Sequence, residues 1–226
     1  MHGFGYSTST KEYKVVSVCK SGRDPNFGIL YVYTLGSGTG WRYVMKMDYD
    51  VLFHKQIGAF ANGAVHWLGK EGTIVAFDLD DEEFRKLPPP PCLPRDGTRP
   101  SFGTLLVIGD VLCTYYKFKR GIEIWFLKEN INNTGDVIWS QECSHVNVIP
   151  ITFTNSGCLL CYDCCAKNVY HYVPTVSSFD LLGNFGGNFQ FGIPHTNTLV
   201  SLKALGEEDT KQMDMKEQDL VRDRKQ

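Results

Sequence analysis

The chain has 226 residues and a mass of 25.5 kDa, and 42% of its residues are hydrophobic and 21% charged. This balance is typical of a globular protein and excludes an intrinsically disordered one. The formal charge is −2, from 23 basic and 25 acidic residues, which excludes the strongly basic signature of a non-specific nucleic-acid binder. The sequence shows neither a run of about 18 apolar residues nor an apolar leader, so we expect no membrane partner and a cytoplasmic or nuclear location.

Short β-prone runs fill residues 1–205. They are rich in Val, Ile, Tyr, Phe and Trp and are bounded by Gly, Asn, Asp or Pro, as is typical of strands. The apolar residues show no sustained helical period, so the sequence predicts an all-β domain. The clearest strands are expected at residues 13–18, 29–35, 64–68, 73–79, 104–107, 111–116, 122–127, 158–162 and 169–173.

A repeat emerges when these runs are aligned. A glycine precedes an apolar strand at Gly63, Gly109 and Gly157, and these glycines are 46 and 48 positions apart. An aromatic-centred run follows each such strand, and its aromatic residues Phe77 and Trp125 are 48 positions apart. A later aromatic residue completes each unit, and an earlier, partial unit contributes two more aromatic positions. The later positions are Phe84, Trp139 and Phe179, and the earlier unit contributes Tyr33 and Trp41.

A period of 44 to 48 residues with aromatic markers is typical of β-propeller blades. A single sheet has two apolar faces, and stacking sheets side by side around an axis buries both of them. Three full units and one partial unit are fewer than most closed propellers have. We therefore predict a propeller-like fold whose ring is incomplete or irregular, and we rank a β-sandwich second.

The C-terminal residues 206–226 differ from the rest in composition. They include seven acidic and five basic residues and no aromatic residue, so the formal charge of −2 lies entirely in this segment. We expect a disordered or weakly helical tail outside a domain at residues 1–205.

Several motifs, in their order along the chain, resemble those of the plant F-box-associated domain, a kelch-related β-propeller. GFGYSTSTKEYKVVSV at residues 3–18 is similar to the opening motif of that family, through Gly5, Tyr6 and the Tyr13–Val16 strand. The most specific segment is ANGAVHWLGKEGTIVAFDLDDEEFRKLPPP at residues 61–90. Further similar stretches are VYTLGSGTGWRYV, GIEIWFLKE, IWSQ and LVSL, at residues 32–44, 121–129, 138–141 and 199–202.

The resemblance implies a non-enzymatic substrate-recognition module of an SCF-type E3 ubiquitin ligase. In such proteins an F-box docks on the Skp adaptor and hence on the cullin, and the propeller presents a protein target for ubiquitination. We expect the F-box itself to be absent from this chain, because Met1 lies within the opening motif. The alternative is an F-box-less interaction protein that competes for the same targets.

Cys158, Cys161, Cys164 and Cys165 form the strongest rival signal, because thiolates at C-x-x-C spacing are typical zinc ligands. A less favoured alternative is therefore a zinc- or thiol-dependent protein that uses this cluster. Cys158 and Cys161, however, are three positions apart on an expected strand, which places their side chains on opposite faces. We therefore expect reduced thiols, with no metal and no cofactor.

No catalytic constellation is apparent, and the target-binding loops stay unassigned. His66 is expected to be a packed histidine, and GSGTG at residues 36–40 a flexible turn. The acidic run after Phe77 is interpreted as a solvated hairpin turn. Asn132–Thr134 matches a glycosylation acceptor, and a small basic and aromatic patch is not expected to bind nucleic acid. The acidic run is Asp78, Asp80, Asp81, Glu82 and Glu83, and the patch is Tyr115, Tyr116, Lys117, Phe118, Lys119 and Arg120.

Overall fold

The computed structural model describes most of the chain up to residue 186. The described residues are 1–20, 27–47, 57–69, 72–92, 100, 102–119, 121–129, 137–163 and 165–186. They form β-strands joined by turns and connections, and no helix within them is long and apolar enough to cross a membrane. The charged segment at 206–226 and the LVSL stretch at 199–202 lie outside the described residues.

The strands build four antiparallel sheets of four strands each, and in every sheet the strands lie in chain order. The first two sheets contain β1 (His2–Ser7), β2 (Glu12–Lys20), β3 (Gly28–Thr34) and β4 (Trp41–Met47), then β5 (Ala59–Ala61), β6 (Ala64–Leu68), β7 (Ile74–Asp78) and β8 (Phe84–Leu87). The third and fourth contain β9 (Phe102–Ile108), β10 (Val111–Phe118), β11 (Gly121–Glu129) and β12 (Val137–Val146), then β13 (Ile149–Phe153), β14 (Leu159–Asp163), β15 (Asn168–Val173) and β16 (Ser178–Asn184).

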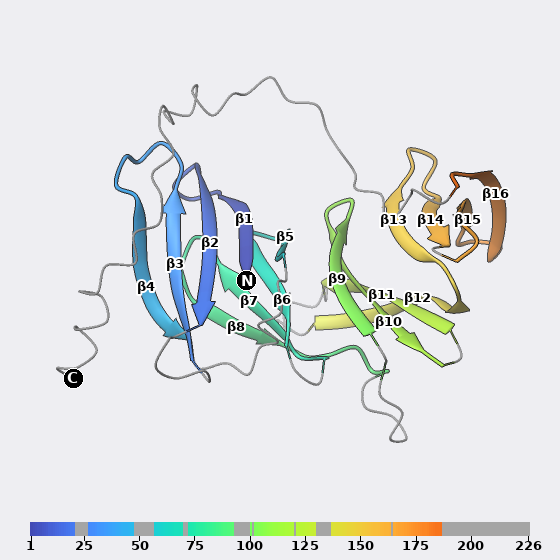
Figure 1. The fold of residues 1–226 in the computed structure, drawn as a ribbon, viewed down its shortest axis with the longest axis horizontal. Helices are drawn as coiled ribbons and strands as arrows, with labels where there is room; N and C mark the ends of the chain where they lie inside the picture. The colour runs from blue at the N-terminus through green and yellow to red at the C-terminus, as the bar shows by residue number, and fades with distance from the viewer. Residues whose placement is uncertain are drawn as a thin grey trace.

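The first strands of successive sheets lie next to one another, and the second strand β6 also contacts β1 and β9. β1 contacts β5, β5 contacts β9, and β9 contacts β13, while a parallel bridge between His2 and Ile57 shows that β1 and β5 run in the same direction. Figure 1 shows the sheets following one another in chain order, with the first and fourth at opposite ends of the row. Within the described residues the sheets therefore form an open row of propeller blades, which confirms the predicted propeller-like fold.

Apolar clusters lie between successive sheets. Val16 and Leu30 of the first sheet pack with Trp67 and Phe77 of the second. The clusters around Tyr116 and Leu112 join the second sheet to the third, and Cys113, Ile124, Leu159 and Tyr172 join the third to the fourth. Each sheet thus buries its apolar faces against its neighbours, which is the physical reason for the repeat.

The aromatic positions of the repeat occupy equivalent places in the four sheets. The last aromatic position of each unit lies in the fourth strand, directly across the ladder from a residue of the third strand. Three of these pairs bring two aromatic rings within 4.6–5.5 Å of each other, which favours tight packing of the outer strand. The pairs are Tyr33 with Trp41, Phe77 with Phe84, Leu127 with Trp139, and Tyr172 with Phe179.

The first unit was expected to be partial, and that expectation is wrong. β1 and β2 complete it, because residues 2–7 pair with residues 12–17 before β3 begins. Gly3 and Gly5 in β1 let this strand approach the second sheet closely, since a methyl group at Gly5 would overlap the Phe60 ring.

Candidate functional site

Alternate turns of the four meanders lie at one end of the sheets, which we call the turn face. In an antiparallel meander, the turn after the first strand and the turn after the third strand lie at the same end. Because the sheets stack with their first strands side by side, these turns gather on one face of the row. The described turns of the turn face are residues 8–11, 35–40, 62–63, 79–83, 109–110, 154–158 and 174–177.

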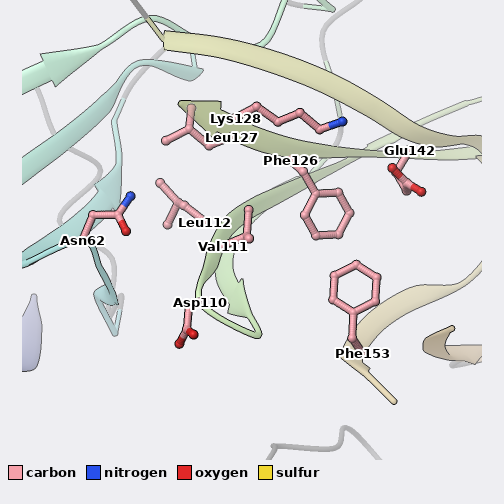
Figure 2. A pocket seen from close by; sticks show the side chains of 9 residues that line it. All are labelled: Asn62, Asp110, Val111, Leu112, Phe126, Leu127, Lys128, Glu142 and Phe153. Atoms are coloured by element: carbon pink, nitrogen blue, oxygen red, sulfur yellow. The ribbon is translucent and has the colours of Figure 1, made fainter. Parts of the chain in front are cut away.

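A pocket of about 450 Å³ opens on the turn face over the end of the third sheet. Its lining comes from three successive sheets, with Asn62 from the second, Asp110 from the third and Phe153 from the fourth (Figure 2). Because residues in or next to turns of three sheets line one pocket, these turns must lie at the same end of the sheets. The full lining is Asn62, Asp110, Val111, Leu112, Phe126, Leu127, Lys128, Glu142 and Phe153.

Two aromatic rings and a bulge shape one side of this pocket. The rings of Phe126 and Phe153 lie 5.5 Å apart between centroids. Trp125 pairs with Gln141 and Ile124 pairs with Cys143, so Glu142 is the extra residue of a β-bulge. A bulge redirects a side chain relative to the regular pleat. Figure 2 shows the Glu142 carboxylate beside the two rings.

The rest of the lining combines apolar and charged side chains. Val111 and Leu112 lie between the two sides of the pocket, and Asp110 and Asn62 stand opposite the rings (Figure 2). Asp110 and Lys128 are exposed, and Glu142 is half-buried. The lining therefore carries two carboxylates and one ammonium group beside apolar side chains.

A second feature of the turn face is a polar clamp between the first two sheets. The Ser7 hydroxyl donates a 2.6 Å hydrogen bond to the Asp80 carboxylate, and the Thr8 hydroxyl donates one of 3.1 Å. The hydrogen bond from Ser7 is the main reason that the pKa of Asp80 lies below its ordinary value. The turn after β7 is thereby tied to the turn after β1.

Glu82 forms the other half of the polar clamp. The buried Lys14 ammonium donates to the Leu79 carbonyl at 2.7 Å and to Glu82 at 3.1 Å. Arg42 donates to both Glu82 oxygens, at 2.6 and 2.9 Å. Burial by itself would raise the pKa of Glu82, but the hydrogen bonds from Arg42 and Lys14 outweigh it and lower the pKa.

The interpretation of the acidic run as a solvated turn is therefore wrong for Asp80 and Glu82. Asp78 stabilises the turn itself, because its carboxylate accepts from the amides of Asp80 and Asp81 at 2.9 and 3.2 Å. Of the five acidic residues in this run, only Asp81 and Glu83 are exposed. The sequence reveals the charges, but their partners in the first sheet are 40 to 73 positions away, from Arg42 for Glu82 to Ser7 for Asp80.

His66 is a packed histidine, as predicted. It is buried, its Nδ1 donates to the Ala59 carbonyl at 3.2 Å, and burial lowers its pKa. The GSGTG stretch forms the turn between β3 and β4, where Ser37 donates to the Thr34 carbonyl at 2.8 Å.

The cysteines of the rival cluster do not share one site in the described part of the chain. Cys161 is buried in the core between the third and fourth sheets, Cys158 is half-buried just before β14, and Cys165 is exposed in the next turn. Cys164 lies outside the described residues. Among the residues that the structure describes, no three His, Cys, Asp or Glu side chains gather as a metal-binding group.

The basic and aromatic patch is not a continuous surface. Tyr115 and Tyr116 are buried in the clusters on either side of the third sheet, while Lys117 and Lys119 are exposed. The rings of Tyr115 and Tyr116 are therefore not available to stack on nucleic-acid bases. Arg120 and the glycosylation motif at Asn132–Thr134 lie outside the described residues.

Comparison with known proteins identifies related sequences from plants. An F-box protein of Arabidopsis thaliana is 28% identical over 153 residues, which cover 56% of this chain and 36% of the relative. An F-box/kelch-repeat protein of the same plant is 25% identical over 134 residues, covering 57% of this chain and 36% of the relative. The chain thus spans about a third of the length of these curated relatives.

Solved structures match at lower identity. A virginiamycin B lyase from Staphylococcus aureus is 12% identical, with a TM-score of 0.41, and the match covers 83% of this chain and 70% of that one. A protein from Lactobacillus plantarum is 14% identical, with a TM-score of 0.42, over 80% of this chain and 54% of that one.

The decisive comparison is with protein families. The sequence profile described as the F-box associated beta propeller domain matches residues 1–171, which include three of the four sheets and most of the fourth. The same stretch holds the opening motif, the polar clamp and the turn-face pocket. This chain belongs to the F-box associated beta propeller domain family.

Proposed function

We propose that this chain is a protein-binding module that presents a target protein to an SCF-type E3 ubiquitin ligase. The observation that carries the proposal is its membership of a domain family whose curated relatives are F-box proteins. An F-box would supply the contact with the Skp adaptor and hence with the cullin. The propeller would supply the contact with the target, in the cytoplasm or the nucleus.

The turn face is the target-binding surface in this proposal. Stacked sheets give a rigid frame, and the turns that project from them are free to differ in sequence without disturbing the core. The pocket on this face is lined from three sheets, so a ligand there would contact residues that the fold holds in fixed relative positions.

Binding rather than catalysis fits the chemistry of this pocket. The residues described around it include no His, Cys, Ser or Thr, so the described lining offers no Ser–His or Cys–His pair of nucleophile and general base. Its two carboxylates are accompanied by large apolar side chains, a combination that is typical of recognition sites.

The test is co-purification from plant cells in which the ligase is active. The chain is expressed with an F-box fused upstream, and the same chain without an F-box is the control. The fusion should recover the Skp adaptor, the cullin and a target whose ubiquitination depends on the fusion, whereas the control should recover only the target.

Two results would contradict the proposal. One is a fusion that recovers the adaptor and the cullin but no target that becomes ubiquitinated. The other is a target whose ubiquitination is equally strong with the control chain.

A further inference from the structure

We infer that the turn-face pocket binds the side chain of an arginine or a lysine that projects from an exposed segment of the target protein. This inference rests on the proposed function, because it names the chemistry of the target at the surface proposed above. The hydrocarbon stem would lie along the apolar side chains, and the cationic head would face the Glu142 carboxylate.

The shape of the pocket suits a long amphipathic side chain. The rings of Phe126 and Phe153 lie on one side, and Val111 and Leu112 lie between the two sides (Figure 2). Methylene groups gain free energy when they leave water for contact with such side chains, and a guanidinium group gains further from an adjacent aromatic ring. A volume of about 450 Å³ leaves room for the residues flanking the basic side chain.

The charges of the lining side chains indicate the charge of the ligand. Glu142 stands beside the rings because the bulge in β12 redirects its side chain, and Asp110 stands on the opposite side. Neither carboxylate takes part in an ion pair within the described residues, whereas Glu82 and Asp78 elsewhere on the turn face do. Two unpaired carboxylates against one ammonium group, that of Lys128, favour a cationic ligand over a phosphorylated or acidic one.

The probe is an array of short peptides with degenerate flanks and one fixed central residue. The central residue is arginine, lysine, norleucine, glutamate or phosphoserine, and retention of the full 226-residue chain is measured on each set. Arginine and lysine sets should retain more chain than the norleucine set, because norleucine keeps the apolar stem but lacks the charge. Glutamate and phosphoserine sets should retain the least.

Three single variants connect this preference to the pocket. Glu142→Gln should weaken binding to the arginine set roughly tenfold, since a charge-assisted hydrogen bond contributes more than a neutral one. Lys128→Gln should strengthen binding by about twofold, because it removes the competing cation. Glu83→Gln is the matched control, since Glu83 is exposed on the turn face but lies outside the pocket.

The variants are compared only if they keep the wild-type melting temperature, because a change in binding is then not caused by unfolding. Preference for glutamate or phosphoserine, or no retention on any set, would overturn the inference. So would an arginine preference that Glu142→Gln leaves unchanged. If the ligase fusion recovers a target that the Glu142→Gln variant binds equally well, the proposed function stands and this inference fails. An arginine preference without ligase association would support this inference and contradict the proposed function.

Discussion

At the scale of single residues, the opening motif is explained by close packing between the first two sheets. A side chain at Gly5 would collide with Phe60 and Leu79, which belong to the second sheet or to the turn that follows β7. We expect Gly5→Ala to destabilise the fold by about 1–3 kcal/mol, the usual cost of overpacking a well-packed contact. The midpoint of urea unfolding measures this change.

A double variant separates this contact from a backbone effect. Phe60→Ala removes the ring that a methyl group at position 5 would meet, so the combined destabilisation should be smaller than the sum of the two single effects. Additive effects would contradict the packing explanation. At the exposed Gly38, a side chain would meet nothing within 4 Å. Gly38→Ala therefore measures the cost of a left-handed backbone alone, which is roughly 1 kcal/mol.

Thiol reactivity tests the placement of the cysteines. Cys165 is exposed, whereas Cys113 is buried between the third and fourth sheets and burial raises its pKa far above the ordinary value. Because the thiolate is the reactive form, brief alkylation of the folded chain should modify Cys165 and leave Cys113 and Cys161 intact. Peptide mass spectrometry identifies the modified sites, and equal modification of Cys113 and Cys165 before unfolding would show the placement to be wrong.

At the scale of structural elements, the polar clamp joins the turn after β7 to the first sheet. Glu82→Gln would leave the buried Lys14 ammonium with a weaker partner, so we expect a loss of about 1–3 kcal/mol in the free energy of unfolding. Glu83→Gln, at the exposed neighbouring position, should change it by less than about 0.5 kcal/mol. Equal effects of the two substitutions would contradict the structural role of Glu82.

The polar clamp also predicts how stability depends on pH. The folded-state pKa values of Asp80 and Glu82 lie below the ordinary values of 3.8 and 4.5. Their contribution to stability is therefore complete above these ordinary values and is lost as the pH falls through the lower, folded-state values. Urea unfolding from pH 6 down to about pH 3 should show a steeper loss for the wild-type chain than for an Asp80→Asn, Glu82→Gln double variant. Parallel curves would show that other carboxylates dominate.

Several strands that the sequence predicted have β-branched or aromatic side chains buried on both faces, as in β3, β6 and β7. Three of the strands it missed have a physical reason for a weak signal. β1 contains Gly3 and Gly5, β8 reads Phe-Arg-Lys-Leu and is largely exposed, and β13 contains Pro150. Only pairing with a neighbouring strand makes such segments extended, and that pairing is not visible in the local sequence.

The turn-face pocket could not be predicted from the sequence either, because its residues come from separate strands and turns. Asp110 lay within the recognised glycine turn, but nothing linked it to Glu142 or Phe153. Glu142 reaches the pocket through a β-bulge, which changes the alternation of side chains and leaves no clear mark in the sequence. The fold class and the repeat therefore followed from periodicity, whereas the site required the register of individual strands.

At the scale of the whole molecule, the first and fourth sheets of the described row carry exposed apolar side chains. Phe4 and Tyr13 stack with ring centroids 5.6 Å apart on the first sheet and are 51% and 38% exposed, and Leu181 and Leu182 on β16 are 60% and 57% exposed. We expect the isolated chain to self-associate as its concentration rises, because such patches gain free energy by leaving water.

Sedimentation velocity over a range of concentrations measures this association. A Leu181→Lys, Leu182→Thr double variant should shift the distribution towards monomer, since both side chains are exposed and their replacement leaves the core unchanged. A wild-type chain that stays monomeric at all concentrations would contradict the expectation.

We propose that the turn face binds the target, and one measurement tests this claim most directly. The F-box fusion carrying Asp110→Asn and Glu142→Gln is compared with the unsubstituted fusion and with a Lys119→Gln fusion, whose exposed substitution lies at the opposite end of the third sheet. Quantitative mass spectrometry gives the ratio of recovered target to recovered Skp adaptor. The ratio should fall roughly tenfold for the pocket variant and stay unchanged for Lys119→Gln. An unchanged ratio for the pocket variant, or an equal fall for both, would contradict the claim.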